Sequence, residues 1–132
     1  MKSSPKGEAP RLTLGTALKC RQDPYHRCLI LSDPLTNGGY IVLVRVTTDD
    51  GKWRDRECVL TPAEWVELDH NSTVAYSTAM CERAEAELVK AIQAGEFEVI
   101  APPSLEVLRK VIVAGRTAEG MPPKAQGLLA HL

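Results

Sequence analysis

The sequence contains few aromatic side chains and almost no excess charge of either sign. Aromatic residues make up 5% of the 132 residues, so the core must rest on Leu, Val, Ile and Ala. Lys and Arg together number 16, and Asp and Glu number 17, which gives a formal net charge of −1. A protein that coats DNA needs many contacts from Lys and Arg to phosphates, so this balance argues against that class. It leaves room for a small, local basic site.

Long hydrophobic runs are also missing. No apolar stretch approaches the roughly 20 residues that a membrane-spanning helix requires. The first ten residues, MKSSPKGEAP, carry lysines without the apolar segment of a secretory signal. We therefore expect a cytoplasmic protein that makes no use of a membrane. With 44% apolar and 25% charged residues, the chain should form one domain with a packed core.

The cysteines lack the spacing of a zinc site. They form no C-x-x-C pair, and no histidine stands at zinc-finger distance from them. Most lie in or beside apolar runs, which favours free buried thiols in a reducing compartment, with a metal site or a catalytic thiol as the alternative. The four positions are Cys20, Cys28, Cys58 and Cys81.

The first half of the chain has the pattern of short strands. Residues 1–10 are a loose arm, and the run CLILS (28–32) after it has the length of a buried strand. Asn37-Gly38-Gly39 then supplies residues that tolerate positive φ and indicates a hairpin. YIVLVRVTT (40–48) is apolar on both faces and should be the central strand. Further strands are expected at WRDRECVL (53–60) and STVAYST (72–78), which together indicate a small antiparallel barrel or a strongly bent sheet.

The second half is helical. Apolar residues recur every four positions from Met80 to Ile92 and predict an amphipathic helix over about residues 78–94. FEVIA (97–101) should be a brief extended segment, and Ser104 has the features of an N-cap for a second helix that ends at Gly115. The sequence therefore predicts an α+β fold, with a barrel over residues 11–78 and two to three C-terminal helices over residues 79–132 packed on it.

One set of motifs resembles a known family. Arg27 followed by CLILSDP, then a glycine-bearing hairpin, then YIVLVRV ending in Thr47-Thr48, is similar in order and spacing to the MazF/PemK-like (Kid-like) toxins of bacterial toxin–antitoxin systems. STVAY (72–76) is similar to a later strand of these toxins. The resemblance covers about residues 12–78 and implies an SH3-like barrel, a homodimer and an antitoxin protein as partner. The C-terminal helices make the chain an atypical, longer member.

The resemblance also implies a reaction. Toxins of this family are metal-independent endoribonucleases that cleave single-stranded RNA by attack of a ribose 2′-hydroxyl on the adjacent phosphate. A guanidinium suits this chemistry, because its rigid fork stabilises the charge that develops on the phosphoryl oxygens. If the roles in the toxins apply to the matching positions, Arg27 would be the charge stabiliser or acid, and Thr47 would contact the phosphate. No metal and no cofactor are implied.

Residues beside these positions are further candidates. His26 adjoins Arg27, and a histidine suits removal of the 2′ proton near neutral pH. This assignment comes from the residue type and is not a family assignment. Thr48, Ser32 and Asp33 are candidate substrate-binding residues. The structural alternative is that Ser32 and Asp33 only end a strand. Since successive strand residues face opposite sides, His26 and Arg27 should not both point into one cleft.

Departures from the toxin pattern support other hypotheses. The element Tyr25-His26-Arg27-Cys28 lacks the glycine and the proline that usually accompany the toxin arginine, and the overall charge is not basic. A catalytically inactive barrel that binds protein or nucleic acid is therefore the main alternative. A structural accessory that forms dimers is the third. His70, in LDHNS, is most simply a turn residue, although it could pair with Asp69.

Overall fold

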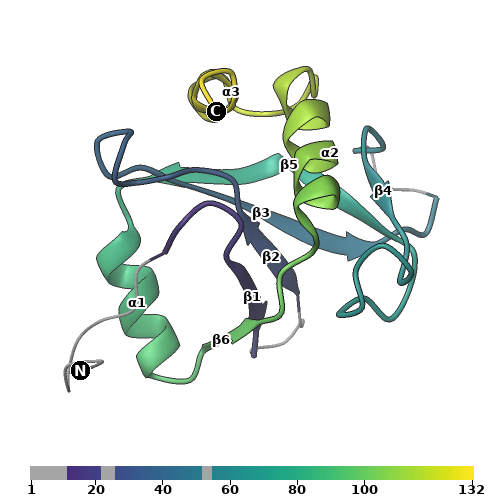
Figure 1. Ribbon diagram of the computed structural model, residues 1–132, viewed down its shortest axis with the longest axis horizontal. Coiled ribbons are helices and arrows are strands. Elements are labelled where there is room, and N and C mark those ends of the chain that lie inside the picture. Colours follow the sequence, from purple (N-terminus) through teal and green to yellow (C-terminus); the bar gives the residue numbers. More distant parts are fainter. Residues whose placement is uncertain (1–11, 22–25, 52–54) are drawn as a thin grey trace.

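A computed structural model describes residues 12–21, 26–51 and 55–132 (Figure 1). The arm predicted for residues 1–10 and most of the short loop RQDPY (21–25) lie outside these ranges. Six antiparallel strands form one sheet in the order β4-β5-β3-β2-β1-β6. The strands are β1 (Ala17–Cys20), β2 (Arg27–Ile30), β3 (Ile41–Thr48), β4 (Val59–Leu60), β5 (Ser72–Glu82) and β6 (Phe97–Ile100), and the helices are α1 (Glu85–Gln93), α2 (Leu105–Arg116) and α3 (Pro123–Leu129).

The α+β class is confirmed, and of the two predicted forms of the β module, a small barrel or a strongly bent sheet, the structure has an open sheet. β4 and β6 form its two edges, and no pairing joins them among the described residues. The chain before β4 attaches to β5 through the side chain of Asp55 and through a backbone bond. The buried carboxylate of Asp55 accepts hydrogen bonds from Ser77 N at 3.1 Å and Ser77 Oγ at 2.5 Å, and Val74 N donates to Cys58 O at 3.0 Å. Of the strand predicted at residues 53–60, the described part forms only Val59–Leu60, and residues 53 and 54 lie outside the described ranges.

The predicted hairpin joins β2 to β3. Gly38 and Gly39 have φ values of 82° and 93°, which residues with a Cβ rarely adopt. The Asn37 side chain closes the turn, since its Oδ1 accepts from Tyr40 N at 2.8 Å and its Nδ2 donates to Tyr40 O at 3.0 Å. β3 lies between β2 and β5, as expected for the central strand. The hairpin thus brings the start of β2 beside the end of β3.

The alternation of side chains along β3 serves two hydrophobic cores. Val42, Val44 and Val46 belong to the core on one face, which α2 and α3 cover. Ile41 belongs to the core on the other face, together with Leu88 of α1. Figure 1 shows α1 and α2 on different sides of the strands. Since both faces are covered there, the first part of β3, Ile41 to Val44, can be apolar on both faces.

The helices follow the predictions with one shift in position. β5 continues to Glu82 because its later residues still pair with β3, so α1 begins only at Glu85. The segment FEVIA forms β6 and pairs with β1. Ser104 is the N-cap of α2, and its Oγ accepts a hydrogen bond from Val107 N at 3.2 Å, as predicted.

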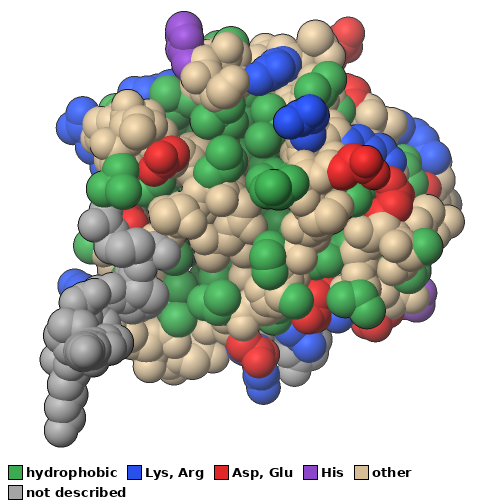
Figure 2. Space-filling view, viewed as in Figure 1, with side chains coloured by type: hydrophobic (Ala, Val, Ile, Leu, Met, Phe, Trp, Pro, Cys, Tyr) green, Lys and Arg blue, Asp and Glu red, His purple; other side chains and the backbone are tan. Residues whose placement is uncertain are grey.

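Part of α2 stays on the surface. Leu105 is 82% exposed and Val113 is 51% exposed. Figure 2 shows apolar side chains beside Lys and Arg side chains on this face. In the part of the chain that the structure describes, no helix has both the length and the apolar composition needed to cross a membrane.

Candidate functional site

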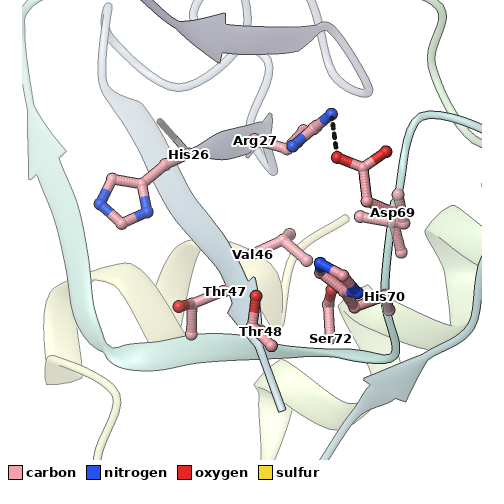
Figure 3. Close-up of a pocket in the computed structure, with 9 residues that line it drawn as sticks. His26, Arg27, Val46, Thr47, Thr48, Asp69, His70 and Ser72 are labelled. Atoms are coloured by element: carbon pink, nitrogen blue, oxygen red, sulfur yellow. Dashed lines mark hydrogen bonds and ion pairs between the residues drawn. The ribbon is translucent and has the colours of Figure 1, made fainter. Parts of the chain in front are cut away.

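A polar cavity of about 220 Å³ lies where β2 begins and β3 ends (Figure 3). Four residues singled out in the sequence, His26, Arg27, Thr47 and Thr48, line it. Their roles in catalysis and binding stay predictions, but their meeting at one cavity follows from the antiparallel hairpin. The complete lining is His26, Arg27, Val46, Thr47, Thr48, Leu68, Asp69, His70 and Ser72.

Arg27 is the less exposed partner of an ion pair in the cavity. Its side chain is 18% exposed, and its Nη2 lies 3.3 Å from Oδ2 of Asp69, whose side chain is 71% exposed. The Nε of Arg27 is buried and has no hydrogen-bond partner among the described residues. A buried donor without a partner costs about 1–3 kcal/mol, so such groups are rare in folded proteins. The guanidinium therefore keeps donors that an anion in the cavity can use.

The strand register divides the lining into two groups. Arg27 stands opposite Val46, and Thr48 stands opposite Ser72. Because opposite residues share a face and alternate residues along a strand share a face, these four side chains lie on the α2 side of the sheet. Thr47 falls on the other face, between Val46 and Thr48. The hydroxyl on the same face as Arg27 is therefore that of Thr48, although Thr47 was the predicted phosphate contact.

His26 also belongs to the face opposite Arg27. Burial, and after it the charge of Arg45, holds the pKa of His26 below its ordinary value of 6.5. Arg45 stands opposite Cys28, two residues along from His26, which places both on that face. In Figure 3 the guanidinium of Arg27 points toward Asp69, while His26 lies on the other side of Arg27. The two neighbours diverge, as the alternation of a strand predicts, but both still line the cavity because His26 lies just before β2.

The loop before β5 contributes residues that the sequence analysis left out of the site. Asp69, His70 and Ser72 line the cavity together with Leu68, which is 5% exposed and packs in the core. A signal for them was present in the strand pattern. If YIVLVRVTT and STVAYST pair antiparallel, the residues just before the second strand must lie beside the end of the first.

Two backbone contacts hold this loop at the end of β3. Asp49 N donates to Asn71 O at 2.9 Å. Ser72 Oγ donates to His70 O at 2.9 Å. The backbone from His70 to Ser72 is therefore fixed, while the side chains of Asp69 and His70 remain exposed.

Ser32 and Asp33 lie at the other end of β2 and do not line the cavity. Ser32 Oγ accepts from Val42 N at 2.8 Å and donates to Tyr40 O at 3.1 Å. Asp33 Oδ1 accepts from Leu35 N at 3.1 Å. These bonds stabilise the hairpin. A role in substrate binding stays a prediction for both residues, and their position gives it no support.

The four cysteines form no disulfide, as the sequence suggested, and Cys28 and Cys58 are buried while Cys20 and Cys81 are partly exposed. Burial, with a smaller contribution from Cys20, raises the pKa of Cys28 from 9.0 to about 12, so this thiol is uncharged at neutral pH. Among the described residues, no three or more His, Cys, Asp or Glu side chains are grouped so that they could hold a metal ion.

Comparisons with known proteins identify a shared fold. No model of a protein family matches the chain, and no curated protein matches it. A chain in the crystal structure of MazE-MazF (Form-II) from Deinococcus radiodurans is similar, with a TM-score of 0.53 and 19% identity, over 87% of this chain and 99% of that chain. The resemblance to MazF/PemK-like toxins is thereby confirmed at the level of the fold.

Proposed function

We propose that the protein is a toxin-like endoribonuclease of a toxin–antitoxin system, which cleaves single-stranded RNA by attack of a ribose 2′-hydroxyl on the adjacent phosphate. The observation that carries this proposal is Arg27, whose buried Nε lacks a partner at a polar cavity. The MazF-like fold supports it, because the sequence motif that contains Arg27 is the one that resembles those toxins. Such an enzyme would act on RNA in the cytoplasm.

The cavity offers groups suited to this reaction. When the 2′ oxygen bonds to phosphorus, negative charge builds on the non-bridging oxygens, and a fixed guanidinium stabilises it. The hydroxyl of Thr48 shares a face with Arg27 and can donate to one of these oxygens. With about 220 Å³, the cavity is smaller than most pockets for whole ligands, so it would hold one phosphate and part of its ribose.

Cleavage of a long, mixed-sequence single-stranded RNA in excess EDTA tests the proposal. We expect products with a 2′,3′-cyclic phosphate and a 5′-hydroxyl, and Arg27→Ala should lower the rate by about 10²- to 10³-fold. Arg27→Lys should recover only part of the loss, since an ammonium cannot replace the planar fork. Arg21→Ala is the matched control, because Arg21 is an exposed arginine that pairs with Glu98. Equal cleavage by the wild type and Arg27→Ala would refute the proposal.

A catalytically inactive module that binds protein or nucleic acid is the second candidate. Asp69 favours it, because its carboxylate already occupies one end of the Arg27 guanidinium. This candidate predicts RNA binding that depends on Arg27, without any product after prolonged incubation.

We further infer an antitoxin-type protein partner and a homodimer. The support for a partner is that the similar structure is that of MazE-MazF. Co-purification with the product of a neighbouring gene tests the partner, and light scattering at high concentration tests the dimer. A monomer in light scattering would exclude the dimer.

A further inference from the structure

We propose that His70 is the residue that removes the proton from the attacking 2′-hydroxyl. This inference rests on the endoribonuclease function proposed above. It assigns a catalytic role to a residue that lies outside the toxin-like motifs, on the loop that precedes β5.

The first argument comes from the charges of the cavity. Its titratable side chains are those of His26, Arg27, Asp69 and His70. A guanidinium stays protonated at physiological pH and cannot accept a proton. The Asp69 carboxylate lies 3.3 Å from Arg27 and already accepts a hydrogen bond from this guanidinium. The two histidines remain as proton acceptors.

The register of the sheet distinguishes the two histidines. His26 directly precedes β2 and also lines the cavity, but its ring turns to the face of Arg45, whereas Arg27 and Thr48 share the α2 face. A phosphate bound between Arg27 and Thr48 would therefore lie on the face that the His26 ring does not share. His70 reaches the cavity from a loop, so the alternation of β2 does not apply to it. Figure 3 places His70 beside Ser72 and Asp69, on the side toward which Arg27 points.

The third argument concerns how His70 is held. The bonds from Asp49 N to Asn71 O and from Ser72 Oγ to His70 O fix its backbone at the end of β3. Its ring makes no hydrogen bond or ion pair with the described residues. Thr48 stands opposite Ser72 in the ladder between β3 and β5, so it lies close to this loop. A general base at this place requires a fixed backbone and a ring nitrogen that no protein group occupies, and His70 has both.

The proposed step moves one proton and exchanges one bond at phosphorus. A nitrogen of the neutral His70 ring accepts the 2′ proton as the bond between the 2′ oxygen and phosphorus forms. The bond between phosphorus and the 5′ oxygen breaks, and that oxygen takes a proton from water. Arg27 stays protonated and stabilises the phosphoryl oxygens. The imidazolium then returns its proton to solvent, and no metal or cofactor takes part in this proton transfer.

The test compares three single variants in the RNA cleavage assay with EDTA. We expect His70→Ala to lower kcat by about 10²- to 10⁴-fold with little change in KM, because a general base acts in the transition state. His131→Ala changes the histidine that does not line the cavity and should stay within about threefold of the wild type, while His26→Ala tests the rival base. All three histidines of the chain are thereby compared, and the loss of His70, an exposed loop side chain, should not unfold the protein. The wild-type rate should rise with pH on the acidic side of its profile, and this limb should vanish in His70→Ala.

A second readout does not depend on cleavage. Addition of a mixed-sequence DNA oligonucleotide, which lacks the attacking hydroxyl, should shift the NMR signal of the His70 ring. The role of His70 is overturned if the wild type and His70→Ala are equally active, or if the acidic limb of the pH profile persists in His70→Ala. Either result leaves the ribonuclease proposal standing. A wild type that cleaves no RNA and shows no shift of the His70 signal overturns both. Loss of activity in His26→Ala alone returns the role of base to His26.

Discussion

Arg27 stands directly opposite Val46 in the ladder between β2 and β3. This pairing decides which side chains can act together. A register shifted by one residue would exchange the faces of all the side chains of β2 relative to β3. As observed, the guanidinium shares a face with Thr48, and the hydroxyl of Thr47 points to the opposite face.

Substitution of the two threonines tests this register directly. Thr48→Val should lower kcat/KM for RNA by about tenfold, the size of one lost hydrogen bond to a charged group. Thr47→Val should change it by less than about threefold. Valine keeps the shape and the preference for a strand, so both variants should fold. If Thr47→Val is the more damaging variant, the family-based assignment of Thr47 holds, and the substrate does not follow the α2 face.

Removal of the Asp69 carboxylate should strengthen RNA binding. The carboxylate competes with a phosphate for Arg27, and as an exposed partner it contributes little stability itself. We expect Asp69→Asn to lower the Kd for a fluorescent DNA oligonucleotide by about two- to tenfold in an anisotropy titration at fixed salt. Glu106→Gln, on α2, makes the same change in net charge and serves as the control. Weaker binding by Asp69→Asn would show instead that Asp69 positions Arg27.

A hydroxyl in the core links β5 to α2. Tyr76 is 0% exposed, and its hydroxyl donates to Val111 O at 2.7 Å. Tyr76→Phe should lower the free energy of unfolding by about 1 kcal/mol, as measured by urea denaturation. Tyr40→Phe is the control, since the Tyr40 ring contacts the cations of Lys124 and Arg83 near the surface, and should change stability very little. Equal effects of the two substitutions would contradict the prediction.

The buried thiol of Cys28 should make stability fall in alkali. Burial raises its pKa from 9.0 to about 12, so between these values the folded chain keeps a proton that the unfolded chain has lost. The contribution of this thiol is fully present below about pH 9 and decreases as the pH rises toward 12. Between these pH values, Cys28→Ala should make the free energy of unfolding fall less steeply with pH, by up to about 1.4 kcal/mol per pH unit. Urea denaturation at several pH values, with a reductant present, measures it. Parallel profiles for the two proteins would refute this account.

The sequence by itself determined features that depend on neighbouring residues. Asn37-Gly38-Gly39 specified the hairpin because glycine adopts positive φ without a steric penalty. Ser104 specified the start of α2 because its hydroxyl accepts from a backbone N–H three residues later. The apolar run of β3 indicated a strand covered on both faces. From these local signals alone, the start of β2 and the end of β3 could be expected to meet.

Only the tertiary structure decided which side chains face one another. The ion pair between Arg27 and Asp69 joins residues 42 positions apart, and no local pattern encodes such a distance. The register places Thr48 instead of Thr47 beside Arg27, and it follows from how β2, β3 and β5 pack between two cores. The attachment of the chain before β4 to β5 likewise depends on a distant pair, because the carboxylate of Asp55 accepts hydrogen bonds from Ser77. Local propensity selects the elements, whereas burial and long-range hydrogen bonds fix their alignment, and the alignment forms the site.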